Sequence, residues 1–97
     1  MIGRISTWIG SAEQLEGWKK GVLSRVGPMV AKLEGNAGAL FLLDHENGRA
    51  YTITLWQDEE AVTRSDAAAA GSQAKTTGDS GAKMRDWSPR CEVVAKI

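Results

Sequence analysis

The sequence has a single cysteine, a single histidine and two prolines, and each scarcity excludes a class of protein. One cysteine cannot form an intrachain disulfide, so the chain is not a disulfide-stapled secreted domain and a reducing cytoplasm fits best. With Cys91 and His45 as the only residues of their kinds, no metal cluster at ligand spacing can be drawn from them. We therefore expect a cytoplasmic protein that carries no metal and no cofactor.

An excess of charge of one sign and long apolar runs are also missing. Twelve basic and twelve acidic residues cancel, and no basic stripe suggests a nucleic-acid partner. No apolar run approaches the roughly 20 residues that cross a bilayer. Gly10, Ser11 and Glu13 interrupt the N-terminal region too early for a signal peptide. We expect one domain, residues 1–97, with neither nucleic acid nor membrane as a partner.

The strongest local pattern is a β-hairpin. Two apolar runs, Ala39–Leu43 and Ala50–Trp56, flank a turn centred on Asn47-Gly48. Asn-Gly tolerates the positive φ angles of tight hairpin turns, so the pattern predicts two antiparallel strands. A further strand is predicted at Ile2–Ile9, where Ile5, Thr7 and Ile9 alternate with Arg4, Ser6 and Trp8.

An amphipathic helix is predicted between the first strand and the hairpin. Ser11 and Gln14 have the spacing of a capping box. Gly27-Pro28 is expected to break or kink the helix, and Arg25 is expected on its solvated face. One apolar stripe follows the helical period and consists of Leu15, Trp18, Val22, Val26, Met29 and Leu33.

A second helix is predicted from Asp58, its N-cap, to about Lys75. Its apolar residues are small, so it should lie close to the sheet or leave a space beneath it. The composition of residues 76–82 predicts a loop, and Arg90–Ile97 alternates as a last strand. The order β-α-β-β-α-β predicts a ferredoxin-like α+β fold with a four-stranded antiparallel sheet.

One face of this sheet is left uncovered by the predicted helices. Ala39–Leu43 is apolar on both faces, and a strand of that kind should be covered on both. A small domain also gains stability from burial against a partner. A second copy of the chain is the economical cover, so we expect a homodimer.

The chain resembles the dimeric α+β barrel superfamily and, within it, the antibiotic-biosynthesis-monooxygenase-like proteins. The resemblance covers essentially the whole length and rests on the element order and three segments: Gly35–Asp44, Leu55–Ala61 and Cys91–Ala95. It implies a homodimer of two facing sheets with helices outside, and a pocket between each sheet and its helices. The family includes cofactor-free oxygenases of aromatic quinols, haem-degrading enzymes and members without known activity.

Haem degradation is not expected. The haem-degrading relatives pair an Asn on the first strand with a Trp and a His on the second helix. Here the first strand has no Asn, and Asp58–Lys75 contains neither Trp nor His. Those residues cannot be transferred to this chain.

The candidate ligand contacts are aromatic and hydroxyl side chains. Tryptophans line aromatic pockets but more often fill cores and interfaces, and both interpretations stay open for Trp8, Trp18, Trp56 and Trp87. Substrate contact is predicted for Trp56, Trp8, Trp18, Ser6 and Thr54. A solvated surface or a polar patch inside the dimer is predicted, with a binding site as the alternative, from Arg4, Ser6, Thr52, Thr54, Glu92 and Lys96. His45 is interpreted as a surface residue and Cys91 as an unreactive strand residue.

Two functions remain open at this stage. The first is a small cofactor-free monooxygenase acting on aromatic or quinol-type substrates, in which the substrate itself reduces O2. The second is a non-catalytic ligand-binding or stress-associated barrel protein. The absence of an obvious catalytic base favours the second, and no catalytic residue is assigned.

Overall fold

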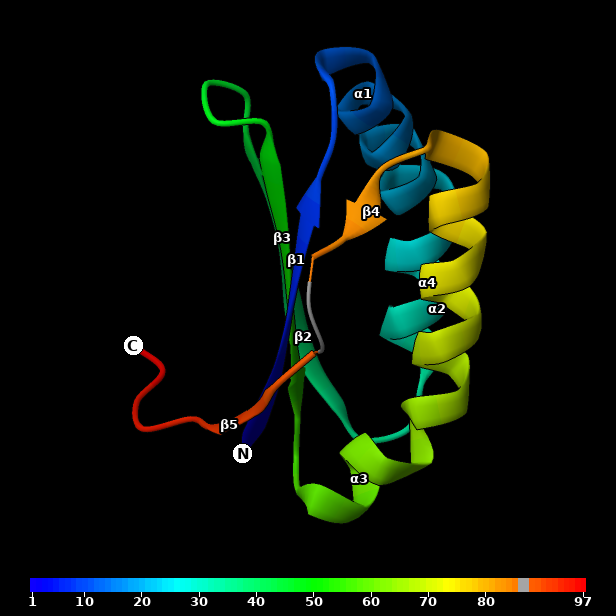
Figure 1. The fold of residues 1–97 in the computed structure, drawn as a ribbon. Coiled ribbons are helices and arrows are strands. Elements are labelled where there is room, and N and C mark those ends of the chain that lie inside the picture. The colour runs from blue at the N-terminus through cyan, green and yellow to red at the C-terminus, as the bar shows by residue number, and fades with distance from the viewer. Residues whose placement is uncertain (86–87) are drawn as a thin grey trace.

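The computed structural model describes residues 1–85 and 88–97 of the chain. Helices cover one face of an antiparallel sheet, and the other face is open (Figure 1). The strands run in the order β2-β3-β1-β4, with β5 also paired to β1. The elements in chain order are β1 Ile2–Ile9, α1 Ala12–Gly21, η1 Val22–Val26, α2 Gly27–Lys32, β2 Asn36–Asp44, β3 Arg49–Trp56, α3 Glu59–Arg64, α4 Asp66–Ser80, β4 Lys83–Met84 and β5 Arg90–Glu92.

The central strand β1 has the two faces that the sequence predicts. Arg4, Ser6 and Trp8 are buried toward the helices, whereas Ile5 and Thr7 point to the open face and are half-buried. In β3 the residues opposite the buried ones are Thr54, Thr52 and Ala50. Because side chains alternate along a strand, this register fixes which residues can line a space under the helices.

The first helical stretch is continuous from Ala12 to Lys32, so the chain does not break at Gly27-Pro28, although the helix type changes there and Pro28 lies in the first turn of α2. A five-residue π-helical turn, η1, precedes the proline, and the Gly27 N–H donates to the Val22 carbonyl five residues back. Proline lacks an N–H and crowds the carbonyl four residues before it, and a widened turn accommodates both effects. The predicted capping box is present, with Gln14 N donating to Ser11 Oγ at 3.2 Å.

The hairpin is confirmed, but its turn is wider than a two-residue Asn-Gly turn. Asp44 pairs with Arg49, so four residues, 45–48, form the turn. Within this turn only Gly48 has a positive φ, at 65°. The Asp44 carboxylate accepts hydrogen bonds from the backbone N–H of Asn47 at 3.1 Å and from its side-chain amide at 2.8 Å. The hydrogen bonds to the Asp44 side chain therefore help to hold the turn, which the sequence had assigned to Asn47-Gly48 alone.

The predicted second helix is two helices, α3 and α4, joined at Ser65, and it is longer than expected. Asp58 caps α3 as predicted, accepting from Ala61 N at 2.8 Å. The predicted loop at residues 76–82 is wrong because α4 continues to Ser80 and stops at Gly81, whose φ is 80°. A glycine in the left-handed region is the usual helix stop. The polar residues before it stay helical because Thr76 is buried and hydrogen-bonded.

The last strand is also shorter and more divided than predicted. The edge of β1 pairs with β4 at one end and with the three residues of β5 at the other, and residues 93–97 are not strand. Two short strands, β4 and β5, therefore pair with this edge of β1 in place of one continuous strand. The interpretation of Trp87 lies outside the described residues. Figure 1 shows the C-terminal residues leaving the sheet on the side opposite the helices.

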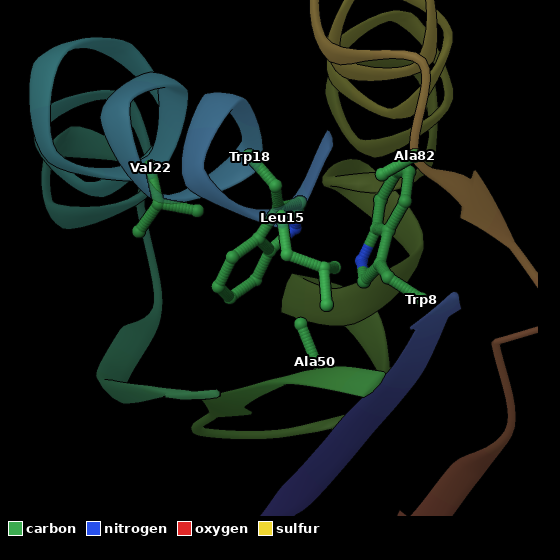
Figure 2. Close-up of a cluster of buried hydrophobic side chains, with 6 residues drawn as sticks. All are labelled: Trp8, Leu15, Trp18, Val22, Ala50 and Ala82. Atoms are coloured by element: carbon green, nitrogen blue, oxygen red, sulfur yellow. The ribbon is translucent and has the colours of Figure 1, made fainter. Parts of the chain in front are cut away.

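The core between helices and sheet has two clusters. Figure 2 shows the larger one, in which Leu15 and Trp18 of α1 pack over Trp8 and Ala50. The smaller cluster consists of Trp56, Ala61 and Val62, with Ile2 and Leu33 packed against it. Within the described part of the chain, no helix has both the length and the apolarity that crossing a membrane requires.

Candidate binding cavity between the helices and the sheet

A cavity lies between the two core clusters, under the helices. It measures about 50 Å³, counted as the space open to the centre of a water-sized sphere. One water needs at least about 10–15 Å³ on that measure, so the cavity holds a few waters as it stands. The space predicted beneath the second helix is therefore present. Its walls come from β1, α1, η1, α2, β3 and α4, with Leu33 after α2 and Ser65 between α3 and α4.

Three tryptophans form the aromatic part of the lining. Trp8, Trp18 and Trp56 all line the cavity, and each is at most 3% exposed. The Trp56 indole N–H donates to Thr54 Oγ1 at 3.0 Å. The Trp8 indole N–H has no hydrogen-bond partner among the described residues. Figure 2 shows the nitrogen-bearing edge of the Trp8 ring turned to the interior of its cluster.

An unpaired buried donor of this kind has a cost. Leaving a buried N–H unsatisfied costs about 1–3 kcal/mol, so most native donors find a partner.

Arg4 is the charged residue of this lining, and it is buried. Its Nη1 donates to Ser65 Oγ at 3.0 Å, and its Nη2 donates to the Val62 carbonyl at 3.1 Å and to the Asp66 carboxylate. Burial lowers the pKa of the Arg4 guanidinium, and the charge of Asp66 opposes that shift. Arg4 remains a cation, since guanidinium groups keep their proton in proteins. The result is a poorly hydrated positive charge at the cavity wall.

A second hollow adjoins the cavity and opens to the surface between α4 and the chain before β5. Arg4, Ala69 and Gln73 line both spaces. Gln73 Nε2 donates to Ser6 Oγ at 3.3 Å and to Ser88 Oγ at 3.1 Å, and the two hydroxyls are 2.7 Å apart. This polar contact lies where the two spaces meet. Asp66, Ala70, Ser88 and Arg90 complete the lining of the second hollow.

Arg25 links two of the helical segments that roof the cavity, η1 and α4. Its guanidinium donates to Thr76 Oγ1 at 2.7 Å and to Ser72 Oγ at 3.2 Å, so it ties η1 to α4. The prediction that Arg25 lies on the solvated face is therefore wrong. The helical period places a residue on a face but cannot show that a neighbouring helix covers that face.

The structure brings all five predicted contact residues, Trp56, Trp8, Trp18, Ser6 and Thr54, to the same cavity. Their role in binding stays a prediction. The polar patch expected inside a dimer is wrong for Arg4, Ser6 and Thr54, which are buried under the helices. Trp8 lies on the same face of β1 as Arg4 and Ser6, and this large apolar residue is the sequence feature that marks the face as the one toward the core. Gln73, Ser65 and Ser72 were missed because nothing in the composition of the second helix marks its inner face.

The remaining candidates lie away from the cavity. His45 is exposed in the hairpin turn, and Cys91 is exposed in β5. Among residues 1–85 and 88–97 no group of three His, Cys, Asp or Glu side chains could hold a metal ion.

The fold and the cavity define a class: a ferredoxin-like α+β sheet with a space beneath its helices. No protein-family model and no curated protein sequence matches the chain. Several solved structures, however, match the chain in fold. A candidate antibiotic biosynthesis monooxygenase of Deinococcus radiodurans is 15% identical, with a TM-score of 0.76 over 100% of this chain and 96% of that one.

Two further solved structures have the same fold. SnoaB, a cofactor-independent oxygenase of Streptomyces nogalater, is 13% identical, with a TM-score of 0.72 over 99% of this chain and 95% of that one. The haem degrader MhuD of Mycobacterium tuberculosis is 20% identical, with a TM-score of 0.68 over 100% and 99%. The chain therefore has the fold of the antibiotic-biosynthesis-monooxygenase-like proteins, as the sequence resemblance implied. At these identities the likeness concerns the fold and leaves function to the residues of this chain.

Proposed function

We propose that the protein is a small cofactor-independent oxygenase that binds an aromatic or quinol-type substrate in the cavity under its helices. The observation that carries the proposal is the cavity itself, which three tryptophans line; one of them, Trp8, has a buried indole N–H without a partner among the described residues. Aromatic side chains stack on aromatic ligands, and a small number of polar groups orient the ligand. The fold shared with SnoaB is consistent with this assignment.

The chemistry needs little from the protein beyond shape. An electron-rich ring can supply electrons to O2 directly, and a phenol with a free para carbon plus one O2 gives a quinone and one water. The Trp8 N–H would donate to the oxygen of the ring. Ser6 and Thr54 offer hydroxyls along the same wall.

Substrate entry requires the roof to move. Pockets for drug-sized ligands measure roughly 300–1,000 Å³, well above the present cavity. The α4 side chains over the cavity are small or polar: Ala69, Ser72, Gln73 and Thr76. The contacts that must lengthen when α4 lifts include the hydrogen bonds from Arg25 to Ser72 and Thr76 and the one from Gln73 to Ser6.

One observation favours the second candidate, a non-catalytic ligand-binding protein. Among the described residues that line the cavity, none is an Asp, Glu, His, Lys, Cys or Tyr. Proton transfer in oxygenation therefore has no side-chain base within the lining. A binding protein would need none.

We further propose that two copies pair through the open faces of their sheets. Leu40 and Leu42 of β2 are 56% and 46% exposed on that face. Val94 and Ile97, in the segment that leaves the sheet on that side, are also exposed (Figure 1). An apolar surface of this kind is typical of an interface. A cytoplasmic location stays a prediction.

Light scattering at micromolar concentration tests the pairing. We expect twice the chain mass for the native protein. The Leu40→Lys variant should be monomeric, whereas Leu23→Lys, a change at an even more exposed leucine of η1, should remain dimeric. A native monomer would refute the proposal.

Oxygen uptake with a panel of hydroquinones and naphthols tests the activity. We expect consumption above the uncatalysed rate, reduced in Trp8→Phe, which keeps a ring but removes the N–H donor. Binding without oxygen uptake would reject the oxygenase and support the binding protein. Haem with a reductant should lose no absorbance, because α3 and α4 carry neither Trp nor His; steady bleaching would contradict this.

A further inference from the structure

The chain carries an unusual feature at the junction of its two hollows, a buried arginine that faces an aromatic cavity. Among the described residues lining the cavity and its outer hollow, the charged ones are two arginines, Arg4 and Arg90, and one carboxylate, Asp66. Asp66 accepts from both arginines. The lining of the two hollows is therefore net positive. Glu59, outside the lining, also pairs with Arg90, and Asp66 is the carboxylate that pairs with Arg4 among the described residues.

The arginine is held in place by groups that a ligand would not displace. Ser65 Oγ and the Val62 carbonyl accept from Arg4, and both residues are buried. The Arg4 side chain is 8% exposed, whereas that of its partner Asp66 is 49% exposed. The Asp66 carboxylate can thus turn away from Arg4 when another anion takes its place, while the guanidinium stays at the wall.

The strand sets the spacing between this cation and the unpaired indole. Arg4, Ser6 and Trp8 occupy alternate positions of β1 and all line the cavity. A strand rises about 3.3 Å per residue, so Arg4 and Trp8 are roughly 13 Å apart along it. A linear ligand of three fused rings with an oxygen at each end, lying along β1, would span most of that distance.

We propose that the cavity takes its aromatic ligand as an anion, with an ionised oxygen on Arg4 and a neutral oxygen on the Trp8 N–H. The ligand anion takes the place of Asp66 on Arg4, and Asp66 stays on Arg90. This inference rests on the proposed ligand site.

Charge-assisted hydrogen bonds inside a protein are strong compared with neutral ones. We therefore expect the cavity to discriminate between the ionised and neutral forms of one ring system by about tenfold or more. We also expect the bound ligand to keep its ionised form to a lower pH than in water, since the Arg4 charge favours the anion. The colour of an ionised hydroxyquinone makes the second effect visible.

The test uses the full chain and three probes: 2-hydroxy-1,4-naphthoquinone, which is an anion at neutral pH, its neutral 2-methoxy counterpart, and 1,4-naphthoquinone. Dissociation constants follow from quenching of tryptophan fluorescence and from calorimetry. The hydroxy compound should bind at least about tenfold more tightly than the methoxy compound. Arg4→Met should abolish this preference, and Arg64→Met, a change at an exposed arginine of α3 outside both hollows, should preserve it.

A second variant keeps the test decisive should Arg4→Met fail to fold. Asp66→Asn removes the carboxylate that competes for Arg4 and changes a half-exposed side chain. We expect it to bind the anion several-fold more tightly and to leave the affinity for the neutral probes unchanged. A drop in anion affinity, or a parallel change for all three probes, would overturn the inference.

The outcomes separate this inference from the proposed function. Equal binding of all three probes overturns the anion preference and leaves the cavity as the ligand site. Failure of all three to bind overturns both. An anion preference that disappears in Arg4→Met, without oxygen uptake by any hydroquinone, supports the inference and rejects the oxygenase.

Discussion

The indole N–H of Trp56 donates a hydrogen bond to the hydroxyl of Thr54, two residues earlier on β3, at 3.0 Å. Both side chains are buried, and both line the cavity. Residues two apart on a strand share a face, so the strand itself brings donor and acceptor together. The pair closes the end of the cavity next to the smaller core cluster.

Thr54→Val should destabilise the protein by about 1–3 kcal/mol, because valine matches threonine in shape but leaves the buried Trp56 N–H without an acceptor. Urea unfolding followed by circular dichroism measures the change. Thr52→Val is the matched control: it lies on the same strand face and lines the same cavity. Its hydroxyl has no hydrogen bond within the described part of the chain, so it should shift stability by about 0.5 kcal/mol or less. Equal losses would contradict the role of the pair.

Trp56→Ala should cost about 3–5 kcal/mol, since it empties a nearly fully buried aromatic site at the junction of β3 and α3. A loss of that size threatens a domain of ordinary stability. Chemical denaturation gives the value. Trp56→Phe keeps a ring and should cost less. A loss below about 1 kcal/mol for the alanine variant would show that Trp56 does not anchor the junction.

Two glycines should respond in opposite directions to alanine. Gly71 lies exposed inside α4 with open space where a Cβ would sit, so Gly71→Ala should stabilise by up to about 1 kcal/mol. Gly35 has a φ of 82°, and an added Cβ would lie 2.4 Å from the Cβ of Ala61. Gly35→Ala should therefore destabilise by about 1–3 kcal/mol. Thermal melts of the two variants beside the native protein decide the signs.

Asp44 should titrate below the ordinary range of an aspartate. The hydrogen bonds from the Asn47 side chain and then from its backbone N–H lower the pKa of the Asp44 carboxyl. A depressed folded pKa contributes stability above the unfolded pKa, and that contribution is lost as pH falls through the folded pKa. Asn47→Ala should raise the Asp44 pKa toward its ordinary value. Carbon NMR of the Asp44 carboxyl across an acid titration measures this, and an unchanged pKa would contradict it.

The element order and the strand faces were determined by the sequence alone. Alternation in Ile2–Ile9 separated Arg4, Ser6 and Trp8 from Ile5 and Thr7, and the structure keeps that separation. Caps at Ser11 and Asp58 placed the helix starts, since a capping side chain bonds to backbone only two or three residues away. These signals are local, and nothing distant competes with them.

Tertiary contacts decided the rest. Thr76 stays helical because it is buried and accepts from Arg25, which lies 51 positions earlier in the chain. Arg4 faces the cavity, and not a dimer seam, because α3 and α4 cover its side of the sheet and supply Ser65, Val62 and Asp66 as partners. The periodicity of one strand divides its residues between two faces, but only the packing of helices from elsewhere in the chain decides which face becomes a binding cavity.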